Sequence, residues 1–302
     1  MPSWQTGLAN FIARLSLKPL LGGGVSVDEI RSGVARVERL VPRQLDSVTI
    51  ESEPLSHCEA EWIRPRTPCS DRVVLAFPGG AFITCLPRVE RLMLSRLCLA
   101  ANARGRLVFY RLAPEHPFPA GHDDCIEAYT RLLDSGVAPG RVVIGGVSAG
   151  GAMTLAVLLA LKDRGVPLPA GAYVLSPVAD LSDHRAGSRR VNRRRDPVLR
   201  HELGTDARSM YLGGDLSLVS HPYVSPINGD FTGLPPMLFQ VGSPEILLDD
   251  SRRCVERARA AGVRAEIEVW PGMPHGWQGL AFLPESGQAI DRLADFVREC
   301  CP

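Results

Sequence analysis

The stretch Val142-Val-Ile-Gly-Gly-Val-Ser-Ala-Gly-Gly151 decides how the rest of this chain is interpreted. It places Gly-x-Ser-x-Gly (Gly146, Ser148, Gly150) directly after a β-branched run and before the apolar segment 153–161. A strand that turns sharply into a helix holds its turn residue in a strained conformation and needs small neighbours. Ser148 would then lie at a helix N-terminus, where the Ala149 amide and the helix dipole favour negative charge. Because the pattern alone is also typical of an ordinary glycine-rich turn, its context must decide.

The composition favours one large α/β domain over residues 1–302. The chain is 45% hydrophobic and 22% charged, which suits a sizeable core. Its net charge of +1 gives no overall attraction to nucleic acid or to a membrane. The sequence has no signal peptide pattern and no apolar run of the ~18 residues that a membrane span needs, so we expect a cytoplasmic protein. The cysteines are scattered without a Cys-x-x-Cys pair, so we expect reduced thiols and no metal site.

From residue 73 onward, short apolar runs alternate with segments of helix length. Strands that are buried on both faces have this pattern, which predicts a mostly parallel sheet with helices on both sides. Two alternating segments, 47–51 and 58–63, precede them as paired, half-exposed strands and bring the expected sheet to eight strands. The six apolar runs are 73–77, 106–110, 142–144, 172–175, 237–241 and 265–270.

Two further segments predict a helical cap over Ser148. Residues 1–42 are mainly helical, with Leu8, Phe11, Ile12 and Leu15 on one face and a capping box that begins at Ser26. Residues from about 176 to 235 form a long segment that contains only short helical stretches, at 196–199 and about 201–212. A loop of this length within a compact domain is usually a lid or a binding element.

A histidine and a carboxylate are needed to activate a serine as a nucleophile. His275 follows the last apolar run, where the base of an α/β-hydrolase is expected after the acid. The other histidines considered precede Ser148 or belong to the cap segment: His116, His122, His184, His201 and His221. Glu245 is the favoured acid because it lies closest to a strand end, whereas Asp249 and Asp250 fall where a helix begins and aspartate commonly caps. Asp249 is the alternative acid.

An oxyanion hole needs backbone N–H groups that point at the developing charge. The segment Phe77-Pro-Gly-Gly-Ala-Phe82 follows the first parallel strand and offers two glycines. Gly79 and Gly80, together with Ala149, are the predicted donors. The other interpretation of this segment is a plain turn.

Four blocks of the sequence resemble the hormone-sensitive-lipase-like carboxylesterases of the α/β-hydrolase superfamily. They are residues 78–82, the block Tyr110-Arg-Leu-Ala-Pro-Glu-His-Pro-Phe-Pro-Ala120, the serine motif at 146–151, and residues 241–250 together with His275. The resemblance implies an α/β-hydrolase fold and a triad of Ser148, Glu245 and His275. It also implies hydrolysis of short- to medium-chain esters through an acyl-enzyme, without metal or cofactor.

Three positions depart from the family pattern. Pro78 stands where the family usually has histidine, with Ala81 in place of a glycine, and Val147 replaces an acidic residue before the serine. One alternative is therefore a biosynthetic dehydratase, cyclase or acyltransferase on the same fold. A second alternative is a non-catalytic ligand-binding receptor, although the presence of His275 argues against it.

Other residues allow functional and structural interpretations. Phe82, Tyr211 and Trp277 are candidates for lining the substrate pocket or for packing in the core. Arginines cluster in the cap segment, either to recognise an acidic partner or as a solvated loop. We expect a small-molecule ester as the partner, and the oligomeric state stays open, with a homodimer as one alternative. The clustered arginines are Arg185, Arg189, Arg190, Arg193, Arg194, Arg195 and Arg200.

Overall fold

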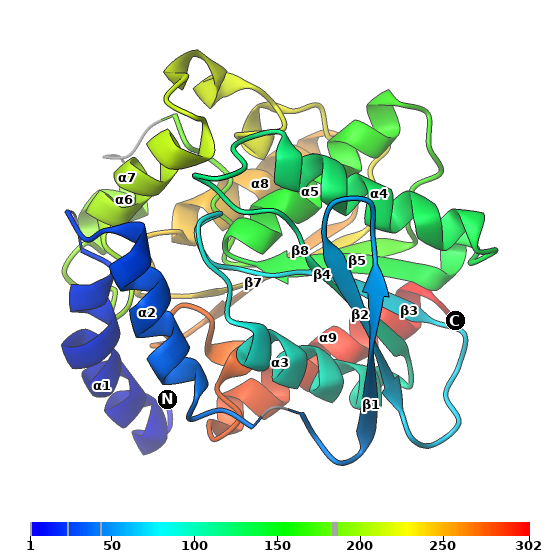
Figure 1. The fold of residues 1–302 in the computed structure, drawn as a ribbon, viewed down its shortest axis with the longest axis horizontal. Coiled ribbons are helices and arrows are strands. Elements are labelled where there is room, and N and C mark those ends of the chain that lie inside the picture. The colour runs from blue at the N-terminus through cyan, green and yellow to red at the C-terminus, as the bar shows by residue number, and fades with distance from the viewer. Residues whose placement is uncertain (1, 23, 43, 183–186) are drawn as a thin grey trace.

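The computed structural model describes residues 2–22, 24–42, 44–182 and 187–302, and Figure 1 shows their fold. His184, one of the histidines considered, and Arg185, one of the clustered arginines, lie outside the described residues. The described part of the chain contains an eight-stranded sheet in the order β1-β2-β4-β3-β5-β6-β7-β8. The pairs β1–β2 and β2–β4 are antiparallel and the other pairs are parallel, so the predicted sheet is confirmed.

The strands match the predicted apolar runs closely. Every residue of β3 and β7 is buried, as expected for strands covered on both faces. The run predicted at 106–110 is displaced toward the N-terminus, because Gly105 pairs with both Val74 and Ile63 and extends the ladder upstream. The strands are β1 Val48–Pro54, β2 Glu59–Pro65, β3 Val73–Phe77, β4 Arg104–Phe109, β5 Val142–Val147, β6 Gly171–Leu175, β7 Met237–Gly242 and β8 Ala265–Trp270.

Helices cover both faces of the sheet and create two apolar cores. Alternate residues of β3 divide between them, with Leu75 and Phe77 in one core and Val74 and Ala76 in the other. The first core is closed by α4 (Ala120–Asp134), α5 (Ala149–Asp163) and α8 (Leu248–Ala260). The second is closed by α3 (Pro87–Ala101) and α9 (Pro284–Cys300). The layers on the two sides of the sheet hold β5 and its C-terminal end in a fixed position.

The predicted cap segments lie together at one end of the sheet, where Figure 1 shows α1 and α2 beside α6 and α7. These helices are α1 Trp4–Leu20, α2 Val27–Glu38, α6 Gly187–Val191 and α7 His201–Tyr211. The capping box of α2 is confirmed, since Ser26 Oγ accepts from the Glu29 amide and Glu29 accepts from the Ser26 amide. Short 3-10 helices connect other segments: η1 Pro139–Arg141, η2 Leu216–Ser220, η3 Pro226–Asn228 and η4 Trp277–Gly279.

One feature of these segments differs from expectation, and a second is visible only in the structure. Residues 196–199 form no helix; the Asp196 carboxylate does accept from the amides of Val198 and Leu199, but these bonds close a turn. The apolar face of α1 points outward, with Phe11 61% exposed. Among the described residues, no helix is both long and apolar enough to cross a membrane.

Candidate active site

Ser148 occupies the turn between β5 and α5 in a strained backbone conformation, with φ 59° and ψ −119°. Its amide donates to the Leu175 carbonyl over 2.8 Å, which ties the turn to the neighbouring strand. A methyl group on Gly150 would lie 1.9 Å from the Phe77 carbonyl oxygen, and one on Gly146 would lie 2.4 Å from the same atom. Only glycine therefore fits on either side of the serine, and the sheet that contributes Phe77 and Leu175 enforces the strain.

His275 lies in the loop after β8 and contacts a buried carboxylate. Its Nδ1 is 2.6 Å from Glu245 Oε2, and Glu245 is completely buried. The second carboxylate oxygen, Oε1, accepts from the hydroxyl of Ser176 over 2.8 Å and from the amide of Gly242 over 2.6 Å. Three hydrogen bonds thereby hold the carboxylate in the orientation that meets the imidazole.

The charges around His275 favour its protonated form. Burial lowers the pKa of the imidazole, but the Glu245 carboxylate, its hydrogen bond and the more distant Asp196 outweigh burial and raise it. Asp196 is itself buried and accepts from the amide of Ile246, which directly follows Glu245. The site is therefore suited to hold a positive charge on the ring once a proton arrives at Nε2.

The other two candidate carboxylates hold the α6 segment instead. Asp249 accepts from the Ser188 amide over 2.7 Å and also pairs with Arg252. Asp250 is buried, accepts from the amides at 179 and 180, and forms an ion pair with Arg189 at 2.6 Å. Neither side chain caps α8, whose N-cap is Leu247, so the capping interpretation of these aspartates is wrong.

The loop after β3 has consecutive residues with positive φ: Gly80 at 125°, Ala81 at 54° and Phe82 at 65°. A methyl group on Gly80 would lie 2.0 Å from the Thr84 carbonyl oxygen, so glycine is required there. The amides of Gly80, Ala81 and Ala149 have no acceptor among the residues that the structure describes. The hydroxyl of Tyr110 stabilises the loop by donating to the Pro78 carbonyl over 2.8 Å.

The predicted donor Gly79 is already engaged. Its amide donates to Glu90 Oε1 over 2.9 Å, and an N–H that is committed to a buried carboxyl is not available to an oxyanion. Burial raises the pKa of Glu90 to about 7; the Gly79 hydrogen bond lowers it and the charge of Glu38 raises it further. The sequence gives no signal for this contact, because a glutamate in the first turn of a helix such as α3 is ordinary.

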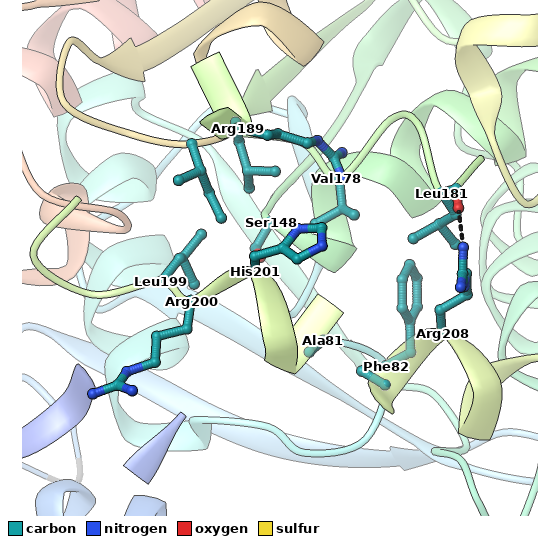
Figure 2. A pocket seen from close by; sticks show the side chains of 13 residues that line it. Ala81, Phe82, Ser148, Val178, Leu181, Arg189, Leu199, Arg200, His201 and Arg208 are labelled. Atoms are coloured by element: carbon teal, nitrogen blue, oxygen red, sulfur yellow. Dashed lines mark hydrogen bonds between the residues drawn. The ribbon is translucent and has the colours of Figure 1, made fainter. Parts of the chain in front are cut away.

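Figure 2 shows the cavity above Ser148, which has a volume of about 60 Å³. Ala81 and Phe82 line it from the loop after β3, while Leu199 and His201 line it from the predicted cap segment. Of the three aromatic candidates, Phe82 lines the cavity. Tyr211 stacks behind it, with ring centroids 4.0 Å apart.

For Trp277, the core-packing interpretation agrees with the structure. Its side chain is fully buried among Ala9, Met273 and Leu283, and it does not belong to the cavity wall. Of the clustered arginines, Arg189 and Arg200 reach the cavity lining. In Figure 2, Arg208 also lies at the cavity and donates to the Leu181 carbonyl over 3.0 Å.

Comparison with known proteins gives consistent matches. A family model described as alpha/beta hydrolase fold matches residues 74–279. An acetyl-hydrolase of Streptomyces hygroscopicus is 42% identical over 81% of each chain, and an esterase of Acinetobacter venetianus is 35% identical over 97% of this chain and 96% of its own.

Solved structures agree over nearly the whole chain. An esterase from the bacterial hormone-sensitive lipase (HSL) family is 37% identical, has a TM-score of 0.91 and covers 100% of both chains. The esterase EstE5, in a crystal soaked with p-nitrophenyl butyrate, is 36% identical with a TM-score of 0.89 and 98% coverage of both chains.

Proposed function

Since the chain belongs to the alpha/beta hydrolase fold family, among its hormone-sensitive-lipase-like members, and is a carboxylic ester hydrolase, we propose that Ser148, His275 and Glu245 form its catalytic triad. The observation that supports this most directly is the 2.6 Å contact between His275 Nδ1 and a fully buried Glu245, which requires a proton on Nδ1 and leaves Nε2 to act as a base. Ser148 has the strained turn geometry of an activated nucleophile.

The reaction then proceeds in two halves. His275 Nε2 takes the proton of the Ser148 hydroxyl as Oγ attacks the ester carbonyl, and Glu245 stabilises the imidazolium that results. The tetrahedral intermediate collapses when the C–O bond to the alcohol breaks and His275 returns the proton to the leaving oxygen. Water then attacks the acyl-serine with His275 again as the base, which releases the carboxylic acid and restores Ser148.

We assign the oxyanion hole to the amides of Gly80, Ala81 and Ala149. This assignment replaces Gly79 by Ala81, because the Gly79 amide is bound to Glu90 and Ala81 shares the cavity wall with Ser148. The Ala149 amide lies at the N-terminus of α5, where the helix dipole adds to its effect on negative charge. Glu90 then acts as a positioning residue, which holds the loop through its first glycine.

We propose that residues 1–42 and about 176–235 form the cap of a single domain over residues 1–302. Leu199 and His201 contribute to the cavity wall, and α2 supports the oxyanion-side loop because Arg31 donates to the carbonyls of Ile83 and Ala113. A cap made of these segments closes the site on the side away from the sheet.

The cavity favours esters with short acyl groups. A volume of about 60 Å³ is small beside the ~300–1,000 Å³ of typical ligand pockets, which supports this preference. A series of p-nitrophenyl esters from acetate to decanoate tests the proposal. We expect kcat/KM to be highest at acetate or butyrate and to fall beyond hexanoate, and a maximum at decanoate would contradict it.

Two expectations about the cell and the assembly stand as proposals. We propose a cytoplasmic location. A homodimer is the expected assembly if the chain is not a monomer. The mass in solution from light scattering distinguishes a monomer from a homodimer.

A further inference from the structure

The helix α1 presents an apolar stripe to the surface. Five large apolar residues are exposed on it: Trp4 at 75%, Leu8 at 48%, Phe11 at 61%, Ile12 at 53% and Leu15 at 65%. Their spacing of three or four residues places them on one face of the helix. We call them the α1 stripe. Scattered exposed apolar residues are normal, but a contiguous row of this kind marks a contact surface.

The outward orientation of the stripe is fixed by contacts on the opposite face. That face is lined by small side chains, Ala9 and Ala13, which are buried against the protein. Asn10 donates to the Gly272 carbonyl over 2.9 Å, and Ser3 at the N-cap donates through both its amide and its hydroxyl to Glu285. The helix therefore cannot rotate to bury the stripe without losing these hydrogen bonds and its close packing.

Basic residues border the stripe. Arg14 and Lys18 lie between the stripe and the buried face in the helical projection, given 100° per residue. Arg14 donates to the carbonyls of Arg194 and Arg195 over 3.1 and 2.7 Å, so the exposed arginines of that segment lie against the same helix. The helix itself contains no acidic residue. The surface on this side of the stripe is consequently positive.

This charge pattern selects the occupant. Basic residues beside an apolar row favour an occupant that presents negative charge next to an apolar layer. A row of Trp, Phe, Leu and Ile beside Arg and Lys, on a helix that lies along the surface, is the composition of helices that lie in a lipid interface. We propose that the α1 stripe, with Arg14, Lys18 and the arginines 193–195, binds the surface of an anionic lipid membrane.

The proposed contact places the membrane close to the catalytic site. Ala9 of α1 packs against Met273 and Trp277, and His275 lies between these two residues in the same loop. The arginine segment continues directly into Leu199 and Arg200, which line the cavity. An ester within or near the lipid layer would then have a short path to Ser148.

Vesicle flotation tests the proposal, and it is performed on Ser148→Ala protein so that binding is measured independently of catalysis. We expect the protein to float with vesicles of phosphatidylglycerol and phosphatidylcholine and not with pure phosphatidylcholine. Raising the salt should release it, because screening shortens the range of the attraction. Replacing Arg194 and Arg195 by glutamine should weaken binding about 25-fold, given about fivefold for each basic residue.

Substitutions in the α1 stripe test the apolar part of the proposed contact. Trp4→Gln with Phe11→Gln should weaken vesicle binding by at least about tenfold, given the apolar area lost. The matched control is Leu216→Gln, which replaces a 50% exposed leucine of η2 outside the stripe and should leave binding unchanged. Brominated lipid should strongly quench the tryptophan fluorescence of the parent protein. This quenching should be largely absent in Trp4→Phe, which still binds to the vesicles. Thermal unfolding of each variant verifies that the fold is intact.

Several results would overturn the proposal. They are no binding to anionic vesicles, equal binding to neutral vesicles, or stripe variants that bind as well as the control. A protein that is dimeric by light scattering and becomes monomeric on Leu15→Gln would assign the stripe to a second copy of the chain instead.

Discussion

The amide of Gly79 lies 2.9 Å from Oε1 of Glu90, so the first glycine of the oxyanion-side loop is bound to a buried carboxyl group rather than presented to the cavity. The contact joins the end of β3 to the first turn of α3. It fixes the start of the loop whose next residues, Gly80 and Ala81, carry amides without an acceptor among the described residues. The loop geometry therefore depends on a side chain that lies outside every sequence motif.

Glu90→Gln should retain activity, while Glu90→Leu should lose it. Glutamine keeps an acceptor for the Gly79 amide, and we expect kcat within about tenfold of the parent. Leucine leaves that buried amide unpaired, at a cost of about 1–3 kcal/mol, and we expect kcat to fall about 10–100-fold with a smaller change in KM. Steady-state kinetics on p-nitrophenyl butyrate measure both, and equal losses in the two variants would show that Glu90 does not act through its hydrogen bond.

The same glutamate should make stability depend on pH. Its folded pKa of about 7 lies above the ordinary value of 4.5, so its contribution is complete below pH 4.5 and is lost as the pH rises through about 7. Glu90→Gln cannot ionise. The free energy of unfolding of the parent relative to Glu90→Gln should therefore decrease between about pH 5 and pH 8 in urea titrations. A constant difference over that range would mean that the Glu90 pKa is not raised.

Glu245→Gln should cripple activity, whereas Asp249→Asn should spare it. The amide oxygen is needed to accept from the Ser176 hydroxyl and the Gly242 amide, so the NH2 group would face His275 Nδ1 and impose the wrong tautomer. We expect kcat to fall about 10⁴-fold. Asp249 holds α6 through the Ser188 amide, so its variant should lose some stability and keep kcat within about threefold. Thermal unfolding separates the two effects. The reverse kinetic result would make Asp249 the acid.

The activity should fall on the acid side through a pKa above that of a free imidazole. Catalysis needs neutral His275 as a base, and its surroundings raise its pKa from 6.5 by favouring the protonated ring. The acid limb of kcat/KM against pH should therefore lie above pH 6.5. The residual activity of Glu245→Gln should show that limb at lower pH, because the largest source of the rise is removed. An unchanged limb would contradict the role of Glu245.

Phe82→Ala should shift the preference toward longer acyl groups. The Phe82 ring forms part of the cavity wall and is backed by Tyr211, so its removal opens space next to Ser148. We expect the ratio of kcat/KM for hexanoate to that for butyrate to rise about tenfold. Tyr223→Ala is the control, since that ring stacks on His122 instead. A shift of equal size in both variants would indicate general loosening.

Much of this arrangement is predictable from sequence because it depends on local pattern. The strands are recognisable because burial on both faces demands continuous apolar runs, and the order of Ser148, Glu245 and His275 follows the order of the strand ends. The partner of the Gly79 amide is set by how α3 packs under the loop, which no local pattern encodes. The place of Trp277 is also not encoded by local pattern. Whether a tryptophan in a loop near a site packs in the core or lines the pocket depends on its neighbours in the folded protein.

The orientation of α1 shows a different limit. Periodicity identifies an apolar face on Leu8, Phe11, Ile12 and Leu15, but it does not say whether that face is covered. Here Ala9 and Ala13 allow the opposite face to approach the protein closely, and the larger side chains remain outside. The turn at Asp196 is misread for a related reason, because the same side-chain bonds to following amides serve both helix caps and isolated turns.

Ser148 is the proposed nucleophile, and the turnover of p-nitrophenyl butyrate by Ser148→Ala measures how far hydrolysis depends on its hydroxyl. The variant removes only the hydroxyl and should fold with the same unfolding temperature as the parent. We expect kcat to fall about 10⁶-fold, to the level left by the oxyanion hole and binding alone. A folded Ser148→Ala protein that retains full activity would show that Ser148 is not the nucleophile.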